Sequence, residues 1–517
     1  MRLFKSAVAA ACVAAATLVG GVSSGDARAD TWIKAESDHF VIYSNAPEKK
    51  TRAYVKKIEA FRTLTNMLLG SDGGPQVKFD IYLLSLPDQM LSVRPSFSKN
   101  VAGVYMSCGE GSIAYAATQD TGDMFEDQDQ SLVVLFHEYS HYVMFQHAKS
   151  YYPTWYVEGF ADYLSTADPV KGTITIGEES KMRTWTLGED RWISFAKVLN
   201  PDFGFAGDKS NDQWEIGSFY AQSWLLTHYM LSDPARAKAL NAYFALVAGG
   251  GDPIKSWESA TGLKVADLHT TLERYRSKMF YLKLPVPDYA DSGIQVTKLP
   301  AELSDLQLNR SLLATCMPQD QGKAVLDKLT AQKAALGGNI DFRLSLARAQ
   351  LLFGKPEDAE TDLGALVDAA PDNFEANYLL GRVYLKESDT AKGQERNDLI
   401  DAARGFFLAA YKINKLNAPN FYYLARSFSN KPGFPDQNAV NAANGAHVLA
   451  PGVADYAVFA AFTNLATGKR DEAVALLTPF VSDPHDRKSA ERFQKAIDAI
   501  KAGKTTNQVM SLLGGGM

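Results

Sequence analysis

The pattern of apolar and polar residues divides the chain into two parts. From residue 32 to residue 117, short stretches rich in β-branched and aromatic residues alternate with polar positions and predict strands, with one long helical pattern over 48–69. From about residue 193 to residue 279 the apolar spacing is helical. Strands therefore come first and helices follow, which predicts an α+β fold for this first part.

After residue 335 the pattern is Ala-rich and helical, and it recurs with a period of about 33 residues. Each unit has small residues at similar positions and ends near a proline; in the first unit these are Ala347, Gly354, Ala359 and Pro371. Small residues let paired helices approach closely while neighbouring units bury each other's faces. The pattern resembles tetratricopeptide repeats and predicts an all-α helical solenoid, for which a generic helical bundle is the alternative.

These patterns and a proline-containing stretch after residue 285 predict five segments. The repeats offer a concave surface on which a partner protein or a substrate could bind. The predicted segments are a signal peptide over 1–29, an α+β domain over 30–285, a connector with a helical segment over 286–335, helical repeats over 336–500 and a flexible tail over 501–517.

The first residues have the pattern of a cleavable export signal. Arg2 and Lys5 precede an apolar run over 7–19, and Ala27 and Ala29 offer a cleavage site. That run is too short for a comfortable membrane span, and no later segment has eighteen uninterrupted apolar residues. We therefore expect an exported chain, periplasmic or secreted, without a transmembrane segment.

The charge of the chain bears on its possible partners, and its cysteines bear on possible disulfides. The chain has a formal net charge of −6 at pH 7 and no basic run, which argues against nucleic acid as a partner. Removal of the predicted signal would leave Cys108 and Cys316, which are too few for a disulfide framework and lack zinc spacing. They could form one bridge in an oxidising compartment, and the sequence leaves this open.

An HExxH motif lies in an apolar stretch at 137–141. On a helix, residues four apart share a face, so His137 and His141 can hold one ion, and Glu138 reaches the same face. Two imidazoles and a carboxylate beside an open coordination position are the parts of a zinc hydrolase. An amphipathic helix that carries two incidental histidines is the competing interpretation.

Two further carboxylates follow the motif. Glu158 comes seventeen residues after His141 and can complete a set of two histidines and one glutamate if its helix runs back past the first. Asp162 shares a face with Glu158, and a ligating histidine usually donates its other ring N–H to such a carboxylate. Because aromatic and small residues surround both side chains, we expect a packed helix here instead of a solvated acidic face.

Together, the two segments resemble the gluzincin zinc metallopeptidases, and most of all their peptidase-MA-like group. In that group an HExxH helix is followed by a Glu-Gly-x-Ala-x-Tyr helix, which here begins at Glu158. The resemblance covers residues 31–285 and implies a metallopeptidase domain that acts on peptides or proteins. It implies one zinc ion per chain bound by His137, His141 and Glu158, with Glu138 as general base. The spacing to Glu158 is a little shorter than in many gluzincins, which leaves the nearby Asp162 as an alternative third ligand.

Peptide hydrolysis also needs a donor for the developing oxyanion. Many gluzincins supply a tyrosine or histidine from a later helix, and here Tyr220 is the first candidate and His228 the second. A core role is the alternative for both, since aromatic residues at helical spacing usually pack. Residues 101–117 predict two strands, of which one could bind the substrate main chain at a sheet edge, as in related zinc peptidases, or belong to an ordinary hairpin.

The leading hypothesis is an exported zinc peptidase whose repeats recruit a substrate or partner. The alternative is a non-catalytic periplasmic scaffold with an idle peptidase-like domain. The intact set of His137, Glu138 and His141 favours the enzyme, because a drifting site would lose its base or a ligand first. No aminopeptidase motif is evident, which slightly favours an endopeptidase, and the sequence does not specify the substrate.

Overall fold

The fold is described by a computed structural model in which the chain is mostly helical, with a six-stranded mixed sheet and a small three-stranded sheet. The predicted signal peptide and most of the acidic segment before the HExxH motif lie outside the described residues. The structure describes residues 31–70, 77–95, 103–118, 130–147, 151–189, 191–201, 203, 213–482 and 487–514.

The six-stranded sheet has the order β4-β5-β3-β2-β1-β9. The pairs β2–β3 and β3–β5 are parallel, and the other three pairs are antiparallel. Strand β4 is therefore an edge strand, hydrogen-bonded to β5 on one side. The strands are β1 (Ile33–Glu36), β2 (Phe40–Ser44), β3 (Phe79–Leu84), β4 (Gly103–Cys108), β5 (Gly111–Ala117) and β9 (Gln295–Lys298).

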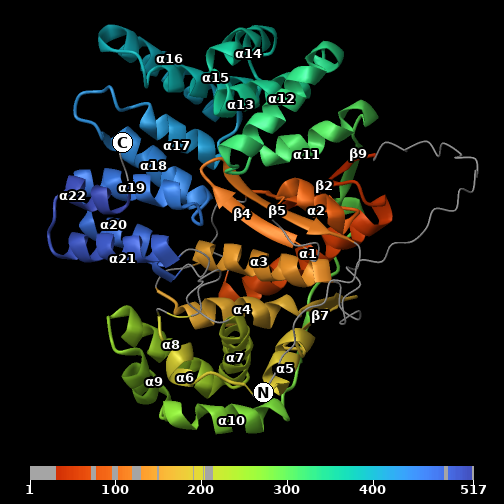
Figure 1. Cartoon of the computed structure of the whole chain (residues 1–517), viewed down its shortest axis with the longest axis vertical. Coiled ribbons are helices and arrows are strands. Elements are labelled where there is room, and N and C mark those ends of the chain that lie inside the picture. The colour runs from red at the N-terminus through yellow and green to blue at the C-terminus, as the bar shows by residue number, and fades with distance from the viewer. Residues whose placement is uncertain are drawn as a thin grey trace, which may run out of the picture.

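Helices cover both faces of this sheet (Figure 1). Along β3, Ile81 and Leu83 point into a core shared with α1 (Glu48–Leu69) and α3 (Gln130–His147), where Phe61 stacks on Phe136 with ring centroids 4.0 Å apart. The alternate residues Tyr82 and Leu84 enter a second core with later helices of the chain. A strand buried on both faces has few polar positions, and β3 reads FDIYLL.

Below α3 lies a second layer of helices, of which α4 (Thr154–Ser165) and α7 (Gln213–Leu231) are central (Figure 1). The three-stranded sheet and short helices complete this part of the molecule. They are β6 (Asp168–Val170), β7 (Thr173–Ile176), α5 (Lys181–Gly188), α6 (Phe195–Val198), α8 (Pro234–Ala248), α9 (Pro253–Thr261), α10 (Leu268–Arg276) and β8 (Leu282–Pro285). The short helix α2 (Met90–Val93) packs instead on the face of the six-stranded sheet that carries Tyr82.

The later part of the chain contains helical repeats, as four successive helix pairs between residues 340 and 477. Small residues bring the paired helices together: a Cβ atom on Gly381 of α15 would lie 2.8 Å from the Phe407 ring of α16. The pairs are α13 (Ile340–Phe353) with α14 (Glu357–Ala369), α15 (Phe374–Glu387) with α16 (Gly393–Ile413), α17 (Ala418–Arg426) with α18 (Gln437–Leu449), and α19 (Ala454–Ala466) with α20 (Arg470–Leu477).

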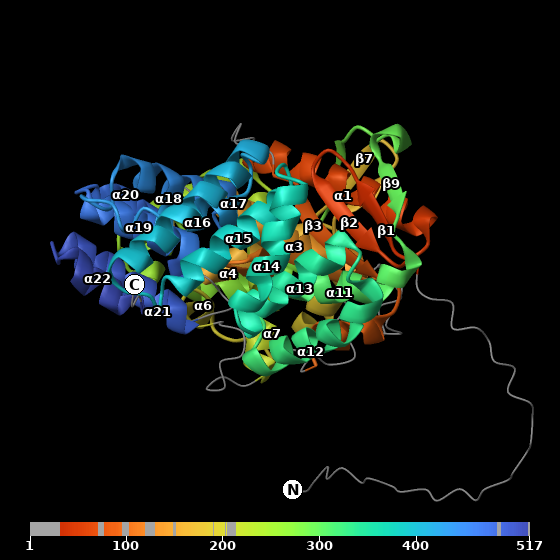
Figure 2. The same ribbon diagram turned by 90° about the horizontal axis from the view of Figure 1, so that it is seen from above.

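The segment 286–335, predicted as a connector, contributes one strand and two helices to the packed fold. Within 286–335, β9 completes the sheet, and α11 (Ser304–Leu312) and α12 (Gln319–Leu336) pack with α13 on the face that carries Tyr82. Helices α11 to α20 then follow one another in an arc above and to the left of the sheet in Figure 1, and Figure 2 shows α13 to α18 side by side.

After the repeats come α21 (Arg487–Lys501) and α22 (Thr506–Leu512). The second of these differs from the flexible tail predicted over 501–517. A capping box begins α22, in which the side chains of Thr505 and Gln508 bond to each other's backbone N–H. Among the described helices, none has both the length and the apolar character needed to cross a membrane.

Candidate metal centre

Three potential metal ligands meet between α3 and α4. The Nε2 atoms of His137 and His141 are 3.1 Å apart, and Glu158 Oε2 lies 3.4 Å from the first and 3.6 Å from the second. His141 and Glu158 are buried and His137 is half-buried. Two histidines four residues apart on α3 therefore face one carboxylate of α4, as their spacing predicts.

The spacing of these donor atoms can be compared with the geometry of a bound ion. Donors about 2.0–2.1 Å from a tetrahedral zinc ion lie roughly 3.3–3.4 Å from one another. The observed distances of 3.1, 3.4 and 3.6 Å bracket this value. The donor set of two imidazoles and one carboxylate is also one that zinc accepts when a fourth position stays open. The three residues therefore fit a single tetrahedral ion.

A close approach between helices fixes the position of Glu158. The next residue, Gly159, lies against α7, where an added Cβ atom would be 2.4 Å from both the carbonyl oxygen of Ser223 and Oγ1 of Thr227. Only glycine lets the two backbones come this close. Every residue of α4 is buried, so the helix that presents Glu158 is held on all sides.

Asp162 lies behind His137. Its Oδ1 is 3.1 Å from His137 Nδ1, the ring nitrogen that does not face the other two ligands. Arg183 of α5 holds the same carboxylate at both oxygens, with Nε 2.8 Å from Oδ2 and Nη2 3.1 Å from Oδ1. This is the carboxylate–histidine arrangement that orients ligating histidines in zinc sites.

The electrostatics of the site favour positive charge at His137. Burial lowers the pKa of His137, but the hydrogen bonds and charges of Asp162 and Glu158 outweigh it and raise that pKa to about 10. Burial would raise the pKa of Asp162, but Arg183 together with His137 lowers it, so Asp162 stays ionised. The pair of carboxylates therefore favours a positive charge at the His137 ring.

Arg183 belongs to the candidate site by its contacts, although the sequence does not single it out. Besides holding Asp162, its guanidinium lies over the Tyr220 ring, with Cζ 5.0 Å from the ring centroid. It sits twenty-one residues after Asp162 on a separate helix, and no local motif marks it. The chain contains 53 Lys and Arg residues, so composition cannot single it out either.

The two oxyanion candidates lie in different surroundings on α7. Tyr220 is half-buried near Glu158; burial and the negative charge of Glu158 raise its pKa well above the ordinary value, so it stays a hydrogen-bond donor at neutral pH. His228 is buried elsewhere, with Nδ1 2.8 Å from the Tyr275 hydroxyl and Nε2 3.0 Å from the Gly177 carbonyl oxygen. Of the two, Tyr220 is the one that reaches the ligand cluster.

Glu138 is part of α3, and the start of β4 packs against the same helix. Glu138 is half-buried, next to His137 in the chain. Gly103, the first residue of β4, approaches the same helix so closely that an added Cβ atom would lie 3.0 Å from Val134 Cγ1. Val134 is three residues before His137, and therefore on the same side of α3. The edge strand β4 thus starts within one helical turn of the ligand cluster.

The comparisons with known proteins add little. No protein-family model matches the chain, and no curated protein matches it. Among solved structures it is similar to a thermophilic TPR protein from Thermus thermophilus, with 20% identity and a TM-score of 0.32 over 39% of this chain and 99% of that chain. This similarity is too low to show a shared fold. The evidence for the repeats is therefore the succession of helix pairs in the structure.

Proposed function

We propose that this chain is a zinc-dependent peptidase of the gluzincin type, with peptides or proteins as substrates. The observation that supports it best is the cluster of His137, His141 and Glu158, whose donor spacing fits one tetrahedral ion. When bound, zinc would supply Lewis acidity, which polarises a carbonyl oxygen and makes water a nucleophile near neutral pH.

The protein's own residues would move the protons. Glu138 would accept a proton from the attacking water and pass it to the amine nitrogen as the peptide bond breaks. The Tyr220 hydroxyl, which its raised pKa keeps protonated, would donate a hydrogen bond to the developing oxyanion. Asp162, held by Arg183, would keep the His137 ring in the orientation that presents Nε2 to the ion.

Substrate would bind along β4. An edge strand has a row of backbone N–H and C=O groups to which an extended peptide can add as a further strand. Because β4 begins beside α3, such a peptide would pass near the ligand cluster. Pairing through the main chain does not require a free chain end, which supports endopeptidase action over exopeptidase action.

The experiment is a comparison of Glu138→Gln with wild type. We expect about one zinc per chain in both proteins, with the variant's peptide hydrolysis lower by a factor of about 10²–10⁴. Glu59→Gln is the matched control, because it neutralises a buried carboxylate on α1 that pairs with His39. Unchanged turnover in Glu138→Gln would exclude Glu138 as the base, and wild type that cannot be loaded with zinc would exclude the metal site.

Export is part of the same proposal. The signal pattern over 1–29 supports it, and so does the disulfide between Cys108 and Cys316, a bond that persists in oxidising compartments. The expected result in cell fractionation is a chain that begins after Ala29 and is recovered outside the cytoplasm. Recovery of the uncleaved chain in the cytoplasm would contradict this part of the proposal.

A further inference from the structure

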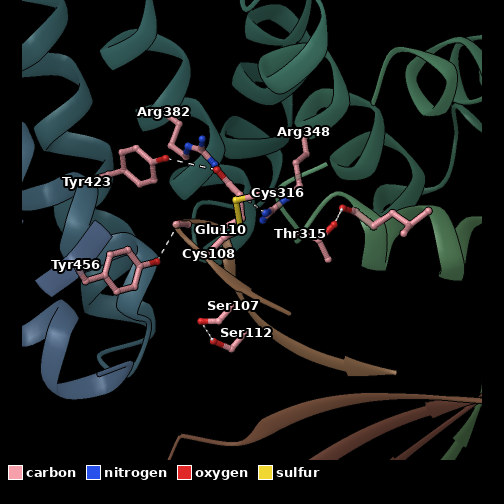
Figure 3. Close-up of a disulfide and its surroundings, with 12 residues drawn as sticks. Ser107, Cys108, Glu110, Ser112, Thr315, Cys316, Arg348, Arg382, Tyr423 and Tyr456 are labelled. Carbon is pink, nitrogen blue, oxygen red and sulfur yellow. Dashed lines mark hydrogen bonds and ion pairs between the residues drawn. A yellow bond between two sulfur atoms is a disulfide. The ribbon is translucent and has the colours of Figure 1, made fainter. Parts of the chain in front are cut away.

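The β4–β5 hairpin ends inside the arc of repeat helices. Its turn, residues 109–110, contacts side chains from α13, α15, α17 and α19. Figure 3 shows Glu110 among these side chains. The four helices are the first helices of the four successive pairs, so they line one common face of the repeats. The hairpin of the sheet therefore occupies the inner face of the repeats.

Glu110 makes the central contact at this tip. Its Oε2 lies 2.5 Å from Arg382 Nη1 and 3.5 Å from Arg348 Nη1, and Oε1 lies 3.5 Å from the Tyr423 hydroxyl. Burial would raise the pKa of Glu110, but Arg382 and Arg348 lower it, so the carboxylate is ionised. The side chains of Glu110 and Arg382 are only 11% and 7% exposed, so this ion pair is largely shielded from water.

Three consecutive residues of the tip are tied to the later part of the chain by three kinds of bond. Cys108, the last residue of β4, forms the disulfide with Cys316, which lies between α11 and α12. The Gly109 carbonyl oxygen accepts a hydrogen bond of 2.9 Å from the Tyr456 hydroxyl of α19. Glu110 adds the ion pair. An ordinary hairpin turn faces solvent, and this one is fixed at every residue.

The two ends of β4 thus have different supports. Gly103 rests on α3 near the ligand cluster, and Cys108 rests on the repeats. Because the strand has a hydrogen-bonded neighbour on one side only, its direction across α3 depends on where its tip is held. At each of these four helices, one side chain of the inner face is engaged by the hairpin tip of the same chain.

We propose that the repeats act within the chain, and that Glu110 is a positioning residue which sets the edge strand β4 beside the ligand cluster. This deepens the proposed function, on which the substrate-binding role of β4 rests. The repeats would then hold the substrate-binding strand β4 in place, with Arg382 and Arg348 binding its tip through Glu110.

The test is hydrogen–deuterium exchange on the full-length, zinc-loaded protein. In Glu110→Gln, which removes the charge and keeps the size, we expect the amides of residues 103–117 to exchange about tenfold faster than in wild type, with zinc content unchanged. Glu59→Gln, the buried carboxylate away from the hairpin, should leave the exchange of this segment as in wild type. Unchanged exchange of 103–117 in Glu110→Gln would overturn the proposal.

A second variant covers the case in which Glu110→Gln does not fold. Tyr456→Phe removes one hydroxyl and keeps the buried ring, and it should raise the exchange of the same segment to a smaller extent. Exchange at the wild-type rate in a folded Tyr456→Phe protein would count against the proposal.

Peptide kinetics provide the functional readout. Both variants should raise KM several-fold and leave kcat nearly unchanged, because the metal ligands and Glu138 do not move. A fall in kcat at constant KM would overturn the positioning role. If wild type hydrolyses no peptide, the proposed function fails, and the exchange experiment still decides whether the repeats hold β4.

Discussion

The Asp162 carboxylate lies 3.1 Å from Nδ1 of His137, behind the ring whose Nε2 faces the other two candidate ligands. The contact fixes which ring nitrogen is available to a metal, and Arg183 keeps the carboxylate charged and in place.

Replacing Asp162 by Asn should weaken metal binding without removing a ligand. The amide cannot stabilise positive charge on the ring, so we expect zinc affinity to fall by a factor of about 10–100. Competition with a chromophoric chelator measures this directly and does not require turnover. Affinity equal to wild type in a folded Asp162→Asn protein would show that the carboxylate has no part in the site.

Gly159→Ala should disrupt the junction of α4 and α7. The new methyl group would meet the Ser223 carbonyl oxygen at 2.4 Å, and overpacking of this kind costs about 1–3 kcal/mol or more of unfolding free energy. Gly364→Ala is the matched control. Gly364 lies inside α14, and an added Cβ atom there would have no neighbour within 4 Å beyond the backbone of its own helix. There we expect a gain of up to about 1 kcal/mol from helix propensity. Urea unfolding of both variants should give opposite signs, and equal shifts would contradict the close approach.

Removal of the disulfide should destabilise the whole chain. The bond between Cys108 and Cys316 spans 208 residues, and closing a loop of this size in the unfolded chain corresponds to about 2–5 kcal/mol of stability. Cys316→Ser should therefore unfold at lower denaturant concentration than wild type under non-reducing conditions. A reducing agent should bring wild type down to a similar midpoint and leave the variant unchanged. Equal midpoints without reductant would mean that the thiols are not paired.

His447 gives the stability of the repeats a pH dependence. Burial on α18 lowers its pKa to about 4, whereas an unfolded histidine titrates near about 6.5. Between these values the unfolded chain binds the proton more tightly, so stability falls as the pH drops from about 6.5 to about 4, by at most about 3 kcal/mol. His447→Leu should remove this loss. Unfolding free energies of variant and wild type at pH 7 and pH 4.5 test it, and parallel pH profiles would refute it.

Local spacing explains what the sequence could predict. His137 and His141 share a face of α3 because residues four apart on a helix must do so, and Glu158 and Asp162 share a face of α4 for the same reason. The helix pairs between residues 340 and 477 follow from small residues at regular intervals, such as Gly381 against Phe407. In each case the information lies within a few turns of helix.

Contacts between segments that are far apart in the chain could not be predicted from the sequence. Arg183 reaches Asp162 from a different helix, and the sequence left the pairing of Cys108 with Cys316 open. The docking of Glu110 between Arg348 and Arg382 joins residues more than two hundred positions apart. No periodicity specifies such pairs, because they depend on how whole elements pack.

The placement of β9 has a consequence for the order in which the chain can fold. Lys298 pairs with Ile33, so the strand at the start of the described chain acquires its outer neighbour only after more than half of the polypeptide has been made. Until then β1 presents an open edge, the kind of surface that associates with other chains. Pairings of such long range also slow folding. Nascent chains halted before residue 295 should therefore depend on chaperones far more than chains released after it.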